Sequence, residues 1–168
     1  MLANWSHELK KVVIFGNSGS GKSTLARELA DSRGLTHLDL DTLAWKASMP
    51  PERMAIEDSK IGIDAFINQN AGWVIEGCYS DLLELVVPIA NEIIFLDLPV
   101  EDCVINAKNR PWEPHKYESK EAQDSNLNML IEWISRYDDR DDTFSRAAHE
   151  TIYRNYPGQK TRYRSNQR

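Results

Sequence analysis

Residues 16–24 combine three glycines, three serines, a lysine, a threonine and an asparagine in one short stretch. Gly16, Gly21, Lys22 and Ser23 fit the pattern G-x-x-x-x-G-K-[ST], in which glycines let the backbone pass close to phosphate oxygens. Successive backbone N–H groups of such a loop make a concave row of donors. We therefore expect a nucleotide's phosphates to be bound by Gly16, Asn17, Ser18, Gly19, Ser20, Gly21, Lys22, Ser23 and Thr24.

Lys22 and Ser23 are the two residues of this loop whose side chains have specific chemistry. In such loops the lysine ammonium bridges the β- and γ-phosphates, and the serine hydroxyl ligates Mg²⁺. The motif thus predicts ATP and Mg²⁺ as cofactors, a catalytic role for Lys22 and a metal-binding role for Ser23. The alternative is a glycine-rich turn with a surface lysine. A strand before the loop and a helix after it would favour phosphate binding.

The flanking residues have those two patterns. Residues 11–16 read KVVIFG, a nearly continuous apolar run that is typical of a strand buried on both faces. After the loop, Leu25, Ala26, Leu29 and Ala30 lie on one face of a helix that Gly34 can end. The loop is therefore expected to join a central strand to a helix, and the helix N-terminus then points at the phosphates.

The rest of the chain alternates between strand-like and helix-like stretches, which predicts a parallel sheet with crossover helices. Further strands are expected within residues 36–41, 72–77 and 92–99, and a possible fifth strand within 160–165. Residues 126–137 read as a helix, and another helix should run up to the turn at 157–159. The chain of 168 residues is the length of one domain, so we expect a single domain over 1–168.

Taken with the motif, the stretches LDTLAW (40–45) and WVIEGCY (73–79) make the chain resemble small P-loop kinases of the adenylate kinase and shikimate kinase type. Among these it is most similar to the adenylate-kinase-related DNA topology modulation proteins. The resemblance implies an α/β, three-layer P-loop NTPase fold with a five-stranded parallel sheet of order 2-3-1-4-5. It also implies an acceptor-binding insert at 42–72 and a mobile LID at 109–126.

The resemblance assigns roles to acidic residues that follow the strands. Glu76 stands where adenylate kinases hold the magnesium shell with an aspartate, so the longer side chain is a departure. Asp97 is the alternative metal residue, or else a helix N-cap or turn residue. In shikimate kinases a similar D-x-D places its first aspartate on the metal and its second on the acceptor hydroxyl. This assigns Asp39 to the metal and Asp41 to the acceptor.

Asp39 and Asp41 are expected on one face at the end of the second strand, because they are two residues apart. A carboxylate there can take the proton of an acceptor hydroxyl or merely orient it. The alternative is a pair of solvated loop aspartates that cap the next segment.

Substrate contacts are expected from the insert, the third strand and the LID. Trp45 is an apolar wall or a core residue, and Arg53 is an anion-binding residue or a paired surface group. Gly77 is expected to border the acceptor. The resemblance places Arg110 in the LID, where an arginine neutralises charge on the transferring phosphoryl group.

Composition limits the other classes of function. The chain has no apolar run long enough to cross a bilayer, its first ten residues lack a secretory signal pattern, and its two cysteines are isolated, so a cytoplasmic protein is expected. The net charge of −6 disfavours a surface that coats nucleic acid. The basic tail at 160–168 is a protected edge strand or a phosphate-backbone contact.

Two function classes remain open. The first is an ATP-dependent phosphotransferase acting on a small acceptor, either a nucleotide or a hydroxylated metabolite. The second is an ATP-binding or ATPase regulatory protein that contacts DNA, as the name of the topology modulation proteins implies. A GTPase is disfavoured because the chain lacks the N-K-x-D motif.

Overall fold

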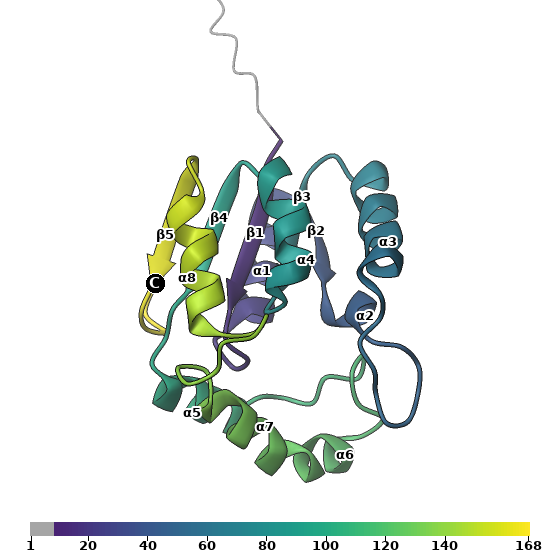
Figure 1. Cartoon of the computed structure of the whole chain (residues 1–168), viewed down its shortest axis with the longest axis vertical. Coiled ribbons are helices and arrows are strands. Elements are labelled where there is room, and N and C mark those ends of the chain that lie inside the picture. The colour runs from purple at the N-terminus through teal and green to yellow at the C-terminus, as the bar shows by residue number, and fades with distance from the viewer. Residues whose placement is uncertain (1–8) are drawn as a thin grey trace, which may run out of the picture.

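The computed structural model describes residues 9–168, so most of the N-terminal stretch inspected for a signal lies outside the described residues. Five strands form one parallel sheet of order β2-β3-β1-β4-β5 (Figure 1). The predicted α/β fold and strand order are confirmed. None of the helices within 9–168 has the length and apolar character needed to cross a membrane.

The strands lie where the apolar runs predicted them. Their bounds are β1 Lys11–Gly16, β2 Thr36–Asp39, β3 Trp73–Gly77, β4 Glu92–Leu96 and β5 Gln159–Tyr163. β1 is central and pairs with β3 and β4, which places Ile14 opposite Glu76 on one side and Ile94 on the other. β2 ends at Asp39, two residues short of the predicted end, because a short helix begins at Asp41.

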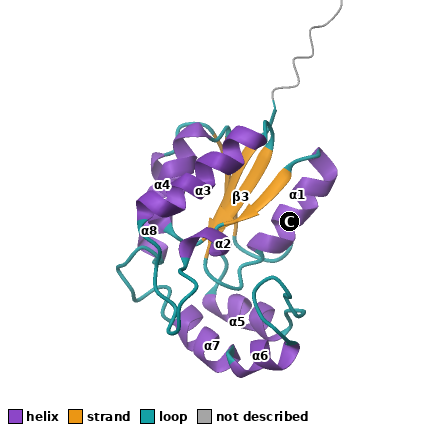
Figure 2. Ribbon diagram, turned by 90° about the vertical axis from the view of Figure 1, so that its right-hand side faces the viewer, coloured by secondary structure: helices purple, strands orange, loops and turns teal. Residues whose placement is uncertain are grey.

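Helices cover both faces of the sheet. α1 (Lys22–Arg33) lies on one face, and α3 (Ile56–Gln69), α4 (Ser80–Val86) and α8 (Arg146–Asn155) lie on the other (Figure 2). α1 ends at Gly34, whose φ of 67° is in the left-handed region and whose N–H donates to the Ala30 carbonyl. The 3-10 helix η1 (Val87–Ile89) follows α4 directly.

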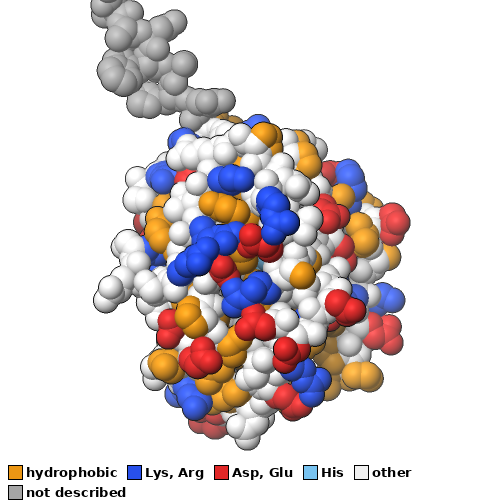
Figure 3. Space-filling model, turned by 60° about the vertical axis from the view of Figure 1, so that its left-hand side comes forward, with side chains coloured by type: hydrophobic (Ala, Val, Ile, Leu, Met, Phe, Trp, Pro, Cys, Tyr) orange, Lys and Arg blue, Asp and Glu red, His pale blue; other side chains and the backbone are white. Residues whose placement is uncertain are grey.

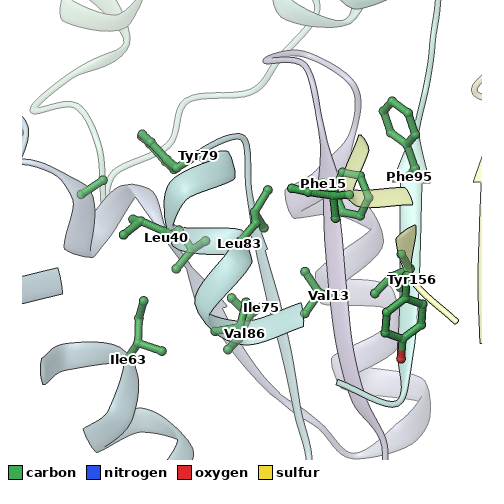
Figure 4. Packing of buried hydrophobic residues seen from close by; sticks show 14 of the residues in the cluster. Val13, Phe15, Leu40, Ile63, Ile75, Tyr79, Leu83, Val86, Phe95 and Tyr156 are labelled. Atoms are coloured by element: carbon green, nitrogen blue, oxygen red, sulfur yellow. The ribbon is translucent and has the colours of Figure 1, made fainter. Parts of the chain in front are cut away.

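Each face of the sheet has its own apolar core. Val13, Phe15, Ile75 and Phe95 point to the side of α4 and α8, where Tyr79 joins the same cluster (Figure 4). Val12, Ile14, Val74 and Ile94 form the opposite cluster with α1. The strands thus alternate their side chains between two buried faces, as a central parallel sheet requires.

Four further helices lie near the carboxyl ends of the strands. α2 (Asp41–Ala44) follows β2, while α5 (Val100–Lys108), α6 (Lys120–Ser125) and α7 (Leu127–Ser135) lie across this end of the sheet (Figures 1 and 2). Cys103 of α5 and Ile134 of α7 belong to the α1-side core. Because parallel strands present their carboxyl ends at one edge, this end of the sheet gathers the loops that follow each strand.

Candidate active site

The glycine-rich loop runs from the end of β1 to the start of α1 with a backbone that only glycine adopts easily. Gly19 and Gly21 have φ values of 78° and 92°. A Cβ atom on Gly19 would lie 2.4 Å from the carbonyl oxygen of Cys103, so α5 leaves no room for a side chain there. Gly21 is the N-cap of α1, which directs the helix N-terminus at the loop.

Neighbouring helices hold this loop in place. The side-chain amide of Asn106 on α5 donates to the Gly19 carbonyl at 2.8 Å, and the Asn17 amide donates to the Ile134 carbonyl at 3.2 Å. Lys22 Nζ donates to the Asn17 carbonyl at 2.7 Å across the loop. The loop is therefore preorganised before any ligand binds, which lowers the cost of ordering it around phosphates.

A cavity of about 510 Å³ opens beside the loop, within the size range of small-ligand sites. Its wall is formed by the loop and α1, by Asp41 after β2, by the end of β3 and by residues 109–117 after α5. The predicted site residues on its wall are Ser18, Gly19, Gly21, Lys22, Ser23, Thr24, Asp41, Glu76, Gly77 and Arg110. Gly77 is also a packing residue, since a Cβ there would lie 2.9 Å from Leu40 Cβ.

Ser23 and Glu76 form the part of the cavity with the right chemistry for Mg²⁺. Ser23 Oγ donates to Glu76 Oε1 at 2.8 Å, and Asp39 is the residue directly opposite Glu76 on β2. Burial, followed by the nearby charges of Glu76 and Asp41, raises the pKa of Asp39. The hydroxyl and the two neighbouring carboxylates are hard oxygen donors of the kind Mg²⁺ prefers, although Asp39, unlike Ser23 and Glu76, is not among the described residues on the cavity wall. These residues fit Mg²⁺ held jointly by protein and phosphates.

Asp97, the alternative metal residue, has a different environment. Its carboxylate is paired with the guanidinium groups of Arg146 and Arg162, and the cavity wall within residues 9–168 does not include it. It is not a helix N-cap either, because Pro99 has that position in α5. The geometry therefore favours Glu76 over Asp97 for the metal.

Asp41 does not share a strand face with Asp39, so the basis for that prediction was wrong. It is the first residue of α2, and its N–H donates to Asp39 Oδ1 at 2.9 Å. The two carboxylates nevertheless converge on Lys116 Nζ, at 3.1 Å from Asp39 Oδ2 and 2.6 Å from Asp41 Oδ2. Burial alone would raise the pKa of Asp41, but Lys116, with smaller contributions from Tyr79 and Lys22, lowers it.

Trp45 and Arg53 lie near Asp41 but are not among the described residues on the cavity wall. Arg53 Nη2 contacts both carboxylate oxygens of Asp81 at 3.1 and 3.2 Å, and its Nε donates to the Ala44 carbonyl at 3.2 Å. Trp45 is 39% exposed and donates its indole N–H to Tyr79 Oη. The pairing of Arg53 matches the alternative of a paired surface group, whereas the exposed Trp45 is neither part of the described cavity wall nor a core residue.

Residues 109–126, the segment predicted to be a LID, begin as a loop after α5 and continue into α6. Arg110 reaches the cavity wall, with Nη1 3.5 Å from Glu113 Oε2 and the guanidinium 5.9 Å from the centre of the Tyr117 ring. Its Nε is buried with no hydrogen-bond partner among the described residues. A guanidinium has five N–H donors, so the contact with Glu113 leaves further donors of Arg110 for an anionic ligand.

Comparison with known proteins identifies the family of the chain. No protein-family model matches the chain. A cytidylate kinase from Haloarcula marismortui is 30% identical over 145 residues, spanning 73% of this chain and 71% of the relative. The chain belongs to the P-loop kinase family. The Bacillus subtilis protein named uncharacterized protein YqaC is 27% identical to this kinase-family chain over 147 residues, or 84% of the chain and 80% of the relative.

Solved structures support the fold of a P-loop kinase. A gluconokinase from Sinorhizobium meliloti 1021 matches with a TM-score of 0.51 and 16% identity, covering 96% of this chain and 85% of its own. The protein TT1252 from Thermus thermophilus matches at 0.51 with 13% identity over 95% and 91% of the two chains. A shikimate kinase from Bacteroides thetaiotaomicron matches at 0.50 with 13% identity over 93% and 86%. At these identities the likeness concerns the fold alone.

Several residues on the wall of this kinase-family cavity were missed from the sequence. Lys116 lies in a polar LID stretch where many residues are charged, so nothing local marks it as the partner of Asp41. The wall also includes Arg27, Asn106, Asn166 and Arg168, drawn from α1, α5 and the chain end. Asn106 and Asn166 exchange amide hydrogen bonds at 2.9 and 3.0 Å, a contact between distant parts of the chain.

Proposed function

We propose that this protein is an ATP-dependent phosphotransferase that moves the γ-phosphoryl group of Mg-ATP to a hydroxyl group of a small acceptor. The observation that supports this most strongly is the cavity that brings the phosphate loop, Glu76, Asp41 and Arg110 together. A nucleotide-binding protein needs the loop alone. A carboxylate for the acceptor and a LID arginine for the phosphoryl group are additional parts that transfer requires.

Each of these residues has a distinct task in the proposed reaction. The loop N–H groups and Lys22 bind the β- and γ-phosphates, and Arg110 stabilises charge on the transferring group. Ser23, Glu76 and Asp39 would hold Mg²⁺, which supplies charge neutralisation at the phosphates. Asp41 orients the acceptor hydroxyl and accepts its proton as the new P–O bond forms and the bond from the γ-phosphorus to the leaving ADP oxygen breaks. Lys116 must first leave Asp41 Oδ2, so acceptor binding and LID movement are linked.

The charges near Asp41 favour a hydroxylated metabolite as the acceptor. Arg53 is the one arginine of the 42–72 insert, and Asp81 already neutralises it. Lys116 is shared among Asp39, Asp41 and Glu113, so carboxylates outnumber it at this end of the cavity. An acceptor phosphate would be buried among these acids with little compensation. A nucleotide acceptor is the second candidate, because the relative from Haloarcula marismortui is named a cytidylate kinase.

A DNA-contacting regulatory protein, the topology modulation alternative, receives less support. The face around β5 and α8 interleaves basic with acidic side chains (Figure 3). Arg162 is paired with Glu150 and Asp97, Lys160 donates to the Tyr153 carbonyl at 2.9 Å, and Arg168 lies 3.5 Å from Glu28. β5 is an edge strand of the sheet. The contacts occupy basic side chains that would otherwise be available to bind a phosphate backbone.

An acceptor screen tests the proposed function. ADP formation from Mg-ATP should be measured alone and with cytidine, cytidine monophosphate, adenosine monophosphate, gluconate, shikimate and simple polyols. We expect one class of acceptor to raise ADP formation at least about tenfold above hydrolysis by water, since positioning an acceptor is a large part of catalysis. Among these compounds the uncharged hydroxyl acceptors should be preferred over the nucleoside monophosphates. Acceptor-independent hydrolysis across the whole screen would contradict the transferase assignment and favour an ATPase.

A further inference from the structure

A chain of hydrogen bonds runs from the insert to the acceptor carboxylate. The indole N–H of Trp45 donates to Tyr79 Oη at 2.9 Å, and Tyr79 Oη is in turn hydrogen-bonded to Asp41 Oδ1. An indole N–H can only donate and a carboxylate can only accept. The tyrosine hydroxyl therefore accepts a hydrogen bond from Trp45 and donates one to Asp41. The direction of the whole chain is set by the chemistry of its two ends.

The surroundings of Tyr79 fix its ring. Tyr79 is 3% exposed and belongs to the core cluster on the α4 side of the sheet (Figure 4). Its ring makes edge contacts with Trp45 and Phe144, and the Arg53 guanidinium lies 4.8 Å from its centre. Arg53 also contacts the Trp45 ring at 5.9 Å while it is bound to Asp81. Arg53 therefore contacts both aromatic donors of the hydrogen-bond chain from Trp45 through Tyr79 to Asp41, which we call the relay.

The two oxygens of Asp41 consequently have different partners. Oδ1 is held from the protein side by Tyr79, and Oδ2 carries the Lys116 ammonium at 2.6 Å. Tyr79 lies in the core, whereas Lys116 lies in the loop after α5 on the cavity wall. The proposed reaction requires this loop to move. Only Oδ2 can be released without disturbing the core. A carboxylate fixed through one oxygen keeps its orientation while the other oxygen exchanges partners.

We propose that Tyr79 is a positioning residue that holds Asp41 through Oδ1, so that Oδ2 faces the acceptor hydroxyl, and that Trp45 holds Tyr79 in turn. This inference rests on the proposed function for the role of Asp41, but the relay itself exists without any ligand. It gives Trp45 and Arg53 an indirect connection to the site, although neither lines the cavity within the described residues. They act through Tyr79.

The relay has a spectroscopic signature in the ligand-free protein. The Trp45 indole N–H resonance, identified by its loss in Trp45→Phe, should shift in Tyr79→Phe because its acceptor is gone. It should also shift in Asp41→Ala, although Asp41 does not receive the indole hydrogen bond, since Tyr79 Oη then reorients. Tyr156→Phe is the matched control, because it removes a tyrosine hydroxyl that donates to the Ala90 carbonyl at 2.8 Å in another part of the core. An unmoved Trp45 resonance in Asp41→Ala overturns the relay.

Turnover measurements test whether the relay positions Asp41 for the reaction. With Mg-ATP and water as the acceptor, Tyr79→Phe should lower hydrolysis about tenfold, the effect of losing one hydrogen bond to a charged group, while Mg-ATP affinity measured by calorimetry stays within twofold. In an Asp41→Ala background the same substitution should cause no further loss, because Tyr79 acts only through Asp41. Equal losses in both backgrounds would overturn the positioning role. The resonance shifts need no turnover, so failure of the relay and failure of the proposed function are distinguishable.

Discussion

Replacing Lys22 with alanine should lower kcat/KM for Mg-ATP about 10³-fold, the range seen when one preorganised group that stabilises transition-state charge is removed. Lys22 is the first residue of α1, and its Nζ lies 2.7 Å from the Asn17 carbonyl on the cavity side of the loop. In the proposed reaction an ammonium there contacts the phosphates directly. The loop should keep its shape, because Asn106 and Asn17 attach it to α5 and α7 independently of Lys22.

Lys60→Ala is the matched control for this substitution. Lys60 is half-exposed on α3, where it pairs with Asp64, so its loss removes the same positive charge without touching the cavity. We expect wild-type Mg-ATP affinity in Lys60→Ala and much weaker affinity in Lys22→Ala, both by calorimetric titration. Equal affinities in the two variants would show that the loop does not bind phosphates as described.

Glu76→Gln should lower turnover about 10²-fold at low Mg²⁺ concentration and raise the Mg²⁺ concentration needed for half-maximal activity. Glutamine keeps the shape and the hydrogen bond from Ser23 Oγ but removes the charge that a hard cation prefers. Part of the loss should be recovered at high Mg²⁺, since the serine, Asp39 and the phosphates remain. Titrating turnover against Mg²⁺ at saturating ATP measures this shift.

Asp97→Asn provides the comparison, because Asp97 is the other acidic residue at the end of a central strand. Its carboxylate is paired with Arg146 and Arg162, so the substitution should lower the free energy of unfolding and leave the Mg²⁺ dependence of turnover unchanged. If Asp97→Asn raises the Mg²⁺ concentration needed for half-maximal activity more than Glu76→Gln does, the metal carboxylate comes from the end of β4.

The features that could be predicted from the sequence are those whose functional residues are neighbours along the chain. The phosphate loop has its glycines, lysine and serine within eight residues, and the apolar run before it is typical of a buried strand. Glu76 was predicted as a site residue from the resemblance to adenylate kinases, and the structure places it on the cavity wall. The strand order followed from the resemblance to small P-loop kinases.

The features that could not be predicted depend on which charged side chains meet across the fold. Arg53 looks like an anion-binding residue in the sequence, and only the fold places Asp81 against it. Lys116 has several charged neighbours along the chain, and its contact with Asp41 depends on how the loop after α5 folds. Asp41 itself was placed on a strand because alternation extends to it, but the strand ends at Asp39 and α2 begins. Local patterns carry no information on such pairings.

The fate of the γ-phosphate tests the central claim most directly. In a single turnover with ATP labelled at the γ-phosphate and the acceptor found in the screen, the label should pass to the acceptor and not to inorganic phosphate. Arg110→Ala should slow this transfer about 10³-fold with little change in Mg-ATP affinity, because the guanidinium acts chiefly in the transition state. Label released only as inorganic phosphate, at the same rate in wild type and Arg110→Ala, would contradict the account.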